Sequence, residues 1–173
     1  EWQSIVELIV NIGEARAGLI MRVQNEEIEV FISSKQANNP YKVGTTEPLA
    51  HSGLYCEAVI KNDEILHVSN ALKSKEWQNI PDLKYGLLCY LGFPIKLPNG
   101  QPFGTICILD DKENDYSSHT IQLIEKMRDL IESHLKLLYI SFHDALTNTY
   151  NRTYFNARVD KEMQQAAQKN EPL

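Results

Sequence analysis

The stretch Leu87–Asp111, LLCYLGFPIKLPNGQPFGTICILDD, is the part of this 173-residue chain that decides its fold class. Two apolar runs flank the turn Pro98–Gly100. Asn-Gly favours a tight β-turn because both residues tolerate a positive φ. Each run is apolar at successive positions, as expected of a strand that is buried on both faces. The pattern therefore predicts an antiparallel hairpin in the middle of a sheet, covered by other elements on each side.

Outward from this hairpin, hydrophobic periodicity predicts three helices and a second hairpin. The expected helices cover residues 1–15, 49–63 and 117–140. The other expected strands are Gly18–Val23, Ile28–Ser33 and residues 64–71. Residues 35–48 and 72–86 are expected to be loops, the second with one helical turn before Pro81. This order predicts an α+β domain with one antiparallel sheet and helices packed against it.

The long helix expected over residues 117–140 carries an unusually wide apolar stripe. Besides a main apolar line, it has a second line at Leu123, Leu130 and Leu137, seven residues apart. One broad core face would explain the stripe. A helix that contacts its own sheet and also a partner helix would explain it as well. We expect the second arrangement, and hence a homodimer formed through this helix.

Composition and charge exclude several classes of protein. The net charge of −6 opposes binding to nucleic acid and to anionic membranes. No run of about 18 apolar residues and no secretion signal is visible, so we expect no membrane contact from this segment. The three cysteines are widely spaced, which predicts reduced thiols in a cytoplasmic protein rather than disulfides or a zinc site.

The segment GLYCEAVIKNDEILHVSNA (residues 53–71), then the hairpin and the long helix, resemble in their order a GAF domain of bacterial signalling proteins. The resemblance covers about residues 1–140. It implies a PAS-related fold with a central antiparallel sheet, a ligand pocket between the sheet and the helices on one side, and a long C-terminal signalling helix. The ligand would be a small molecule whose identity the sequence does not indicate.

The resemblance places the pocket wall in the segments around residues 52–59, 67–71, 72–81 and 84–92. The candidate ligand-pocket residues are Tyr55, Cys56, His67, Asn70, Trp77, Tyr85, Cys89 and Tyr90. Trp77 and the tyrosines could equally belong to the core, and His67 needs no ligand. No catalytic residue is expected in this domain, because no triad or glycine-rich phosphate loop has recognisable spacing.

Three alternatives involve no binding of a regulatory ligand. Cys56 and Cys89 fall near two cysteines of free methionine-R-sulfoxide reductases, although the third cysteine of those enzymes has no counterpart here. The same pair could act as a thiol redox sensor. The domain could also be a ligand-free dimerisation spacer. No metal site is expected, since the acidic positions Asp110, Asp111, Glu113 and Asp115 read as a solvated turn.

The segment HDALTNTYNRTYF (residues 143–155) resembles the DxLTGLxNRxxF start of GGDEF domains, which are diguanylate cyclase modules. The matching junction residues are Asp144, Leu146, Thr147, Asn151, Arg152 and Phe155. The resemblance implies that residues 141–173 are a linker turn and the first helix of a truncated GGDEF domain, in a chain cut from a longer protein.

The resemblance to GGDEF domains also implies what the chain itself lacks. The catalytic loop would lie beyond Leu173, and with it the sites for Mg²⁺ and GTP, so we expect no cofactor in the chain and no synthesis of cyclic di-GMP by it. The predicted function is ligand sensing in a bacterial diguanylate cyclase, transmitted through a dimeric helix.

Overall fold

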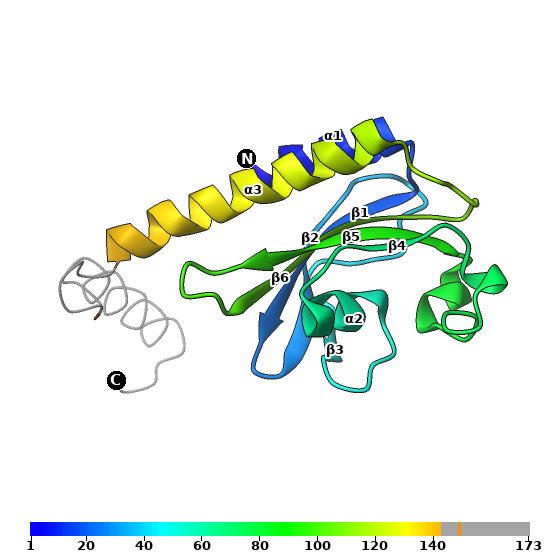
Figure 1. The fold of residues 1–173 in the computed structure, drawn as a ribbon, viewed down its shortest axis with the longest axis horizontal. Coiled ribbons are helices and arrows are strands. Elements are labelled where there is room, and N and C mark those ends of the chain that lie inside the picture. The colour runs from blue at the N-terminus through cyan, green and yellow to red at the C-terminus, as the bar shows by residue number, and fades with distance from the viewer. Residues whose placement is uncertain (143–148, 150–173) are drawn as a thin grey trace, which may run out of the picture. The chain divides into compact units, whose positions relative to one another are not determined.

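The computed structural model of the chain describes residues 1–142 and 149, and its centre is a six-stranded sheet (Figure 1). The strand order is β3-β2-β1-β6-β5-β4, and every neighbouring pair is antiparallel. The strands are β1 (Ala17–Gln24), β2 (Glu27–Ser33), β3 (Thr46–Pro48), β4 (Leu66–Val68), β5 (Cys89–Lys96) and β6 (Pro102–Asp110). The predicted hairpin is confirmed as β5 and β6, and both strands are buried along almost their whole length.

Within residues 1–142, three α-helices and two short 3-10 helices accompany the sheet. They are α1 (Trp2–Gly13), α2 (Tyr55–Asn62), α3 (Ser118–Phe142), η1 (Ala71–Lys73) and η2 (Pro81–Tyr85). The chain divides into two compact units, Glu1–Glu132 and Ser133–Leu173, and α3 runs across the division. The six predicted junction residues between Asp144 and Phe155 lie outside the described residues. Within residues 1–142, no helix combines the length and the apolar character needed to cross a membrane.

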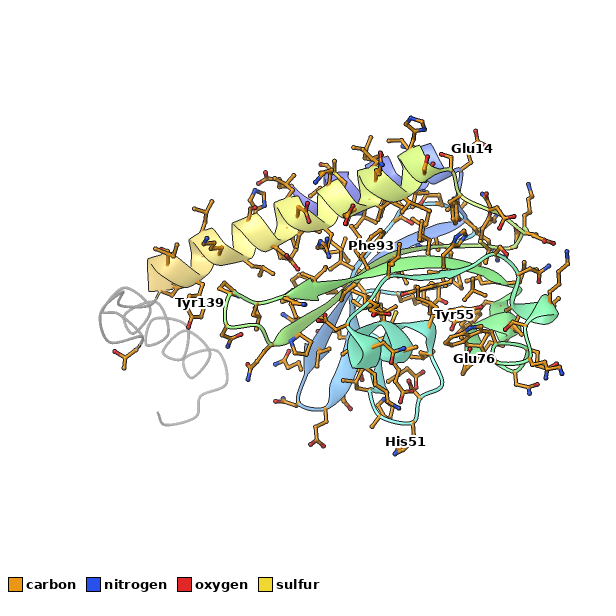
Figure 2. All side chains as sticks on the ribbon, in the orientation of Figure 1. Glu14, His51, Tyr55, Glu76, Phe93 and Tyr139 are labelled. Carbon is orange, nitrogen blue, oxygen red and sulfur yellow. The ribbon has the colours of Figure 1, made fainter. Side chains whose placement is uncertain are left out.

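The sheet has a different cover on each face (Figure 1). One face packs against α1 and the first part of α3: a Cβ added to Gly13 of α1 would meet Ile108 of β6, and the Arg128 guanidinium of α3 lies 5.8 Å from the Phe93 ring centroid. The opposite face packs against α2, η1 and η2, where Tyr90 and Cys107 belong to one buried apolar cluster. Figure 2 shows Phe93 and Tyr55 on opposite sides of the sheet. The α+β class and the long terminal helix are therefore as predicted.

Three details differ from the expected elements. The helix predicted over residues 49–63 begins only at Tyr55, because His51 and Gly53 take positive φ angles of 60° and 69° that interrupt a helix. The loop predicted over residues 35–48 contains the edge strand β3. The loop over 72–86 contains η2, which begins at Pro81, where a fixed φ and a missing N–H suit the first helical position.

In the acidic segment after β6, Asp111, Glu113 and Asp115 are exposed as expected of a solvated turn, and only Asp110 differs. Asp110 is the last residue of β6 and is only 7% exposed. Asp111 is exposed and lies 3.5 Å from the Arg16 guanidinium. No group of three or more His, Cys, Asp or Glu side chains that could hold a metal ion occurs in the described part of the chain.

Candidate functional site

An aromatic stack forms the floor of the site between the sheet and α2. The ring of Tyr90 on β5 is fully buried and lies 4.5 Å from the ring of Tyr55 on α2, at an angle of 18°. Trp77 packs on the same Tyr55 ring at 5.2 Å. Tyr90 can lie flat along its strand because position 92, two residues further on the same face, is glycine. The stack therefore ties α2 and the loop over residues 72–86 to the central hairpin.

Above this floor lie two neighbouring cavities that share part of their lining, an outer and an inner chamber. The outer chamber has a volume of about 150 Å³ and the inner one about 30 Å³. Both chambers are lined by the same four residues where they meet: Met21, Tyr41, Leu54 and Asp82. The inner chamber continues down to Tyr55, Cys56 and Tyr90. The exposed residues Glu47, Lys84 and Tyr85 line the outer chamber at its mouth.

Tyr41 and Asp82 form the partition between the chambers. The Tyr41 hydroxyl donates a short hydrogen bond to Oδ1 of Asp82. Asp82 is only 5% exposed, and no ion pair among the described residues includes it. Burial raises the pKa of the Asp82 carboxyl, and the hydrogen bond from Tyr41 opposes this without offsetting it. Burial also raises the pKa of the Tyr41 hydroxyl, with a further contribution from the Asp82 charge.

The inner chamber holds further polar atoms that are out of water. The buried Tyr55 hydroxyl has no hydrogen-bond partner among the described residues, and desolvation raises its pKa. The Cys56 sulfur lies 3.5 Å from the Tyr90 hydroxyl and accepts a hydrogen bond of 3.4 Å from Thr105. The hydrogen bond from the Cys107 thiol makes the largest contribution to the pKa of Cys56 and lowers it. Further hydrogen bonds from Thr105 and Tyr90 act in the same direction, against the effect of burial. Buried polar groups normally have partners, so the free Tyr55 hydroxyl marks a place where a ligand could supply one.

The segment that closes the mouth on the α2 side is organised by one carboxylate. Glu57 accepts hydrogen bonds from the backbone N–H groups of His51 and Gly53 and from the Ser52 hydroxyl, at 2.8 to 3.0 Å. Slight desolvation tends to raise the pKa of Glu57, but these hydrogen bonds lower it overall. The hydrogen bonds to Glu57 stabilise the turn that places Ser52 and Leu54 at the wall of the outer chamber.

The structure brings together some of the predicted pocket residues. Tyr55, Cys56 and Tyr90 line the inner chamber, and Tyr85 lines the mouth. Trp77 does not line the cavity and supports Tyr55 from behind.

Three predicted residues lie elsewhere. Asn70 caps η1 by accepting a 3.0 Å hydrogen bond from the Leu72 N–H, and it donates another to Glu113. His67 and Cys89 both contact the carbonyl oxygen of Asn114, at 3.1 and 3.5 Å, away from the cavity.

The two predicted redox cysteines are not neighbours, which corrects the hypothesis that Cys56 and Cys89 act as a pair. Cys89 and Tyr90 are adjacent on β5, and successive side chains of a strand point to opposite faces of the sheet. Because Tyr90 faces α2 and contacts Cys56, Cys89 faces the other side. Burial raises the pKa of Cys89 to about 11. The neighbour of Cys56 is instead Cys107, and all three thiols are buried and free.

Sequence reasoning missed the residues that define the outer chamber. Tyr41 and Asp82 lie 41 positions apart, in the two segments 35–48 and 72–86 that were expected to be loops, and neither residue was among the predicted pocket residues. A weak signal was present in IPDLKYG (residues 80–86), where Asp82 stands between a proline and a leucine. Only the contact with Tyr41 distinguishes Asp82 from a solvated carboxylate.

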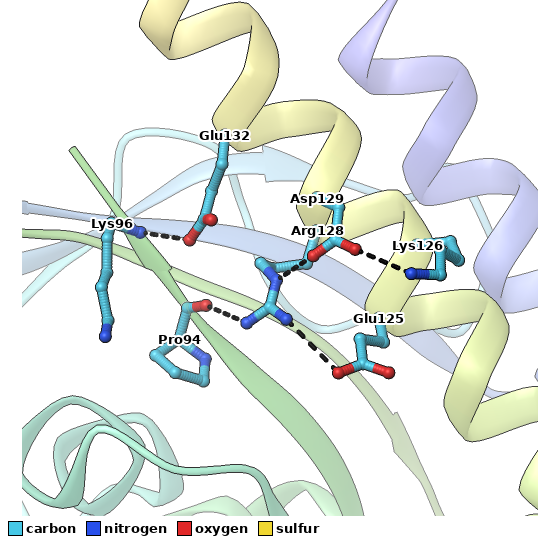
Figure 3. A network of polar contacts seen from close by, with 7 residues as sticks. All are labelled: Pro94, Lys96, Glu125, Lys126, Arg128, Asp129 and Glu132. Carbon is cyan, nitrogen blue, oxygen red and sulfur yellow. Dashed lines mark hydrogen bonds and ion pairs between the residues drawn. The ribbon is translucent and has the colours of Figure 1, made fainter. Parts of the chain in front are cut away.

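Strand β5 connects the cavity to α3. Tyr90 on β5 faces the inner chamber, and four residues later the Pro94 carbonyl accepts a 3.4 Å hydrogen bond from Arg128. The Lys96 N–H donates a 2.8 Å hydrogen bond to Glu132. Figure 3 shows both contacts, together with the ion pairs of Arg128 with its neighbours on the helix. Strand β5 therefore contributes both to the floor of the cavity and to the contacts with the middle of α3.

Comparison with known proteins identifies the architecture. The sequence matches the family model described as "GAF domain" over residues 3–136. Three similar solved structures are a GAF domain of an Acinetobacter phosphoenolpyruvate-protein phosphotransferase, a GAF domain of a two-component sensor histidine kinase from Bacillus halodurans, and a type II free methionine-R-sulfoxide reductase from Thermoplasma acidophilum.

These three structures share the fold at low sequence identity. In the order given, identities are 16%, 13% and 11%, with TM-scores of 0.61, 0.62 and 0.59. The matches cover 76%, 82% and 78% of this chain, and 77%, 97% and 89% of the other chains. A search among curated proteins found no significant match.

Proposed function

The chain belongs to the GAF domain family, and from this premise we propose that it is the ligand-sensing part of a bacterial diguanylate cyclase that acts in the cytoplasm. Residues 1–140 would form the sensory domain, and residues 141–173 the start of a GGDEF output domain. The cyclase assignment is supported by the six junction residues between Asp144 and Phe155. Mg²⁺ and GTP would be bound by the output domain, which would join two GTP molecules into cyclic di-GMP.

The observation that carries the sensing role is the cavity between the sheet and α2. It is concave, mostly apolar, and contains a few polar groups at defined places, as small-molecule sites usually do. Among the described residues, the buried Asp82 forms no ion pair. The buried Tyr55 hydroxyl has no hydrogen-bond partner among them. Both arrangements cost free energy in an empty domain, and a ligand that contacts these groups would offset that cost.

We propose that the signal leaves the cavity through β5. A ligand that shifts Tyr90 would displace the strand that also carries Pro94 and Lys96, and these residues hold Arg128 and Glu132 of α3. A ligand changes the balance between two states only by binding one of them more tightly. The contacts between β5 and α3 would therefore differ between the empty and the occupied domain.

We also propose that α3 forms a homodimer. Ile124 and Ile131 are fully buried, whereas Leu130 and Leu137, on the second apolar line of the helix, are 40% and 67% exposed. Exposed apolar residues at seven-residue spacing are typical of a helix that packs against a partner helix. Sedimentation of the 173-residue chain should give a dimer, and Leu130→Glu with Leu137→Glu should give a monomer. A monomer before substitution would remove this route of transmission.

Two measurements test the sensor and the cyclase separately. Native mass spectrometry of the purified chain should reveal a small molecule that is lost on denaturation, or one that binds from a metabolite mixture. Reading the coding sequence beyond Leu173 should show a GG(D/E)EF loop, and the intact protein should then convert GTP at a rate that the ligand changes. If that loop were missing, the cyclase assignment would be abandoned and the sensor assignment would stand.

A further inference from the structure

We propose that the ligand of this cavity is a small organic cation, with a body of about the size of benzene and an ammonium group that pairs with Asp82. The inference rests on the proposed sensing function and adds the chemical class of the ligand. It follows from the charge, the aromatic rings and the size of the cavity.

The charges around the cavity favour a cation. Asp82 lines both chambers, is 5% exposed, and has Tyr41 as its side-chain hydrogen-bond partner. A second carboxylate, Glu47, lines the outer chamber. A buried carboxylate is stable only when it is paired or protonated. An ammonium group placed at the partition would supply the missing opposite charge, whereas an anion would meet two carboxylates.

The aromatic residues fit the same chemistry. Tyr41 and Tyr85 both line the outer chamber, with ring centroids 5.8 Å apart in an edge-on arrangement. The face of an aromatic ring attracts a cation within about 6 Å of its centroid. The Tyr85 ring already does so, because the Nζ atom of Lys84 lies 4.7 Å above it.

The size of the cavity limits the body of the ligand. An engineered protein cavity of about 150 Å³ accommodates benzene, which is the volume of the outer chamber. The inner chamber of about 30 Å³ has room for one small substituent. Its walls include Tyr55, whose buried hydroxyl has no hydrogen-bond partner among the described residues. A nucleotide would be too large for either chamber.

Among the described residues, Lys84 is the one lysine or arginine on the cavity walls, and it separates binding of a cation from binding of an anion. If the ligand were an anion, the Lys84 ammonium would be its anchor, and Lys84→Gln would weaken binding. For a cation, Lys84 is a competing charge at the mouth, and the same substitution should leave the affinity unchanged or increase it. Asp82→Asn should instead lower the affinity for a cation.

The experiment is calorimetric titration of the 173-residue chain with benzylamine, which is protonated at neutral pH. Benzyl alcohol and benzoate serve as neutral and anionic probes of similar shape. Benzylamine should bind measurably and the other two at least about tenfold more weakly. Asp82→Asn should weaken benzylamine about tenfold or more, because it removes a charged hydrogen-bond acceptor. Asp115→Asn makes the same change at an exposed position and should have no effect.

Other results would overturn the proposal in distinguishable ways. Equal or tighter binding of benzyl alcohol or benzoate, unaffected by Asp82→Asn, would refute the cation and leave the sensing function standing. No binding of benzylamine would refute it too, and if native mass spectrometry then found no bound molecule of any kind, the sensing function would fail as well. Thermal unfolding of each variant shows that it is folded, and Lys84→Gln tests the sign of the charge independently of Asp82.

Discussion

Replacing Gly92 by alanine should destabilise the domain through a single side chain, Tyr90. A Cβ atom at position 92 would lie 2.5 Å from Cζ and 2.8 Å from Cε1 of the Tyr90 ring. Carbon atoms in contact are normally 3.5–4.0 Å apart. The ring has no free space to move into, since it is fully buried and Tyr55 stacks on its other face at 4.5 Å.

The expected cost combines three effects of known size. Overpacking a core costs about 1–3 kcal/mol, and a disturbed aromatic pair about 0.5–1.5 kcal/mol. The lower backbone entropy of alanine in the unfolded chain returns about 0.4–1 kcal/mol. We therefore expect Gly92→Ala to lower the free energy of unfolding by about 2 kcal/mol, measured by urea titration with tryptophan fluorescence.

A double-mutant cycle separates this explanation from a general effect on the strand. Tyr90→Leu removes the atoms that the new methyl group would meet. In that background Gly92→Ala should cost less than about 0.5 kcal/mol, giving a coupling of at least about 1 kcal/mol. If Gly92→Ala were neutral in the wild-type chain, or equally costly in both backgrounds, the account of the stack would be refuted.

Three further predictions concern the titration of Asp82, the contact between β5 and α3, and the thiols. Burial raises the pKa of Asp82 above its unfolded value. The free energy of unfolding should therefore fall as the pH rises through that pKa, by up to about 1.4 kcal/mol per pH unit. Asp82→Asn should remove this contribution. Parallel urea midpoints of the two proteins between pH 4 and pH 8 would contradict this. Glu132→Ala removes the acceptor of the Lys96 N–H and should cost about 1 kcal/mol while accelerating hydrogen exchange at that amide; unchanged exchange would argue against the contact. Mild oxidation of the folded chain should give no Cys56–Cys89 disulfide in peptide mapping, and finding one would mean that the two thiols do not lie on opposite faces.

The candidate site could be predicted only where the signal was local. Tyr55, Cys56 and Tyr90 were found because their elements have clear periodicity and the family resemblance places a pocket beside them. His67 and Cys89 were included because they belong to the same segments, but alternation along β4 and β5 turns them to the other face. A segment can thus be assigned to a site without each of its residues pointing into it.

The fold class follows from local patterns in the sequence, because the strongest signals act over short distances. The turn Pro98–Gly100 and its apolar flanks require a central hairpin, and the apolar lines after Ser117 require a long helix. The chemistry of the cavity, in contrast, depends on tertiary contacts. Tyr41 and Asp82 meet there although 41 positions separate them, and which face of β5 meets α2 follows from how the helices pack. A buried carboxylate is defined by what surrounds it, and those surroundings come from segments far apart in the chain.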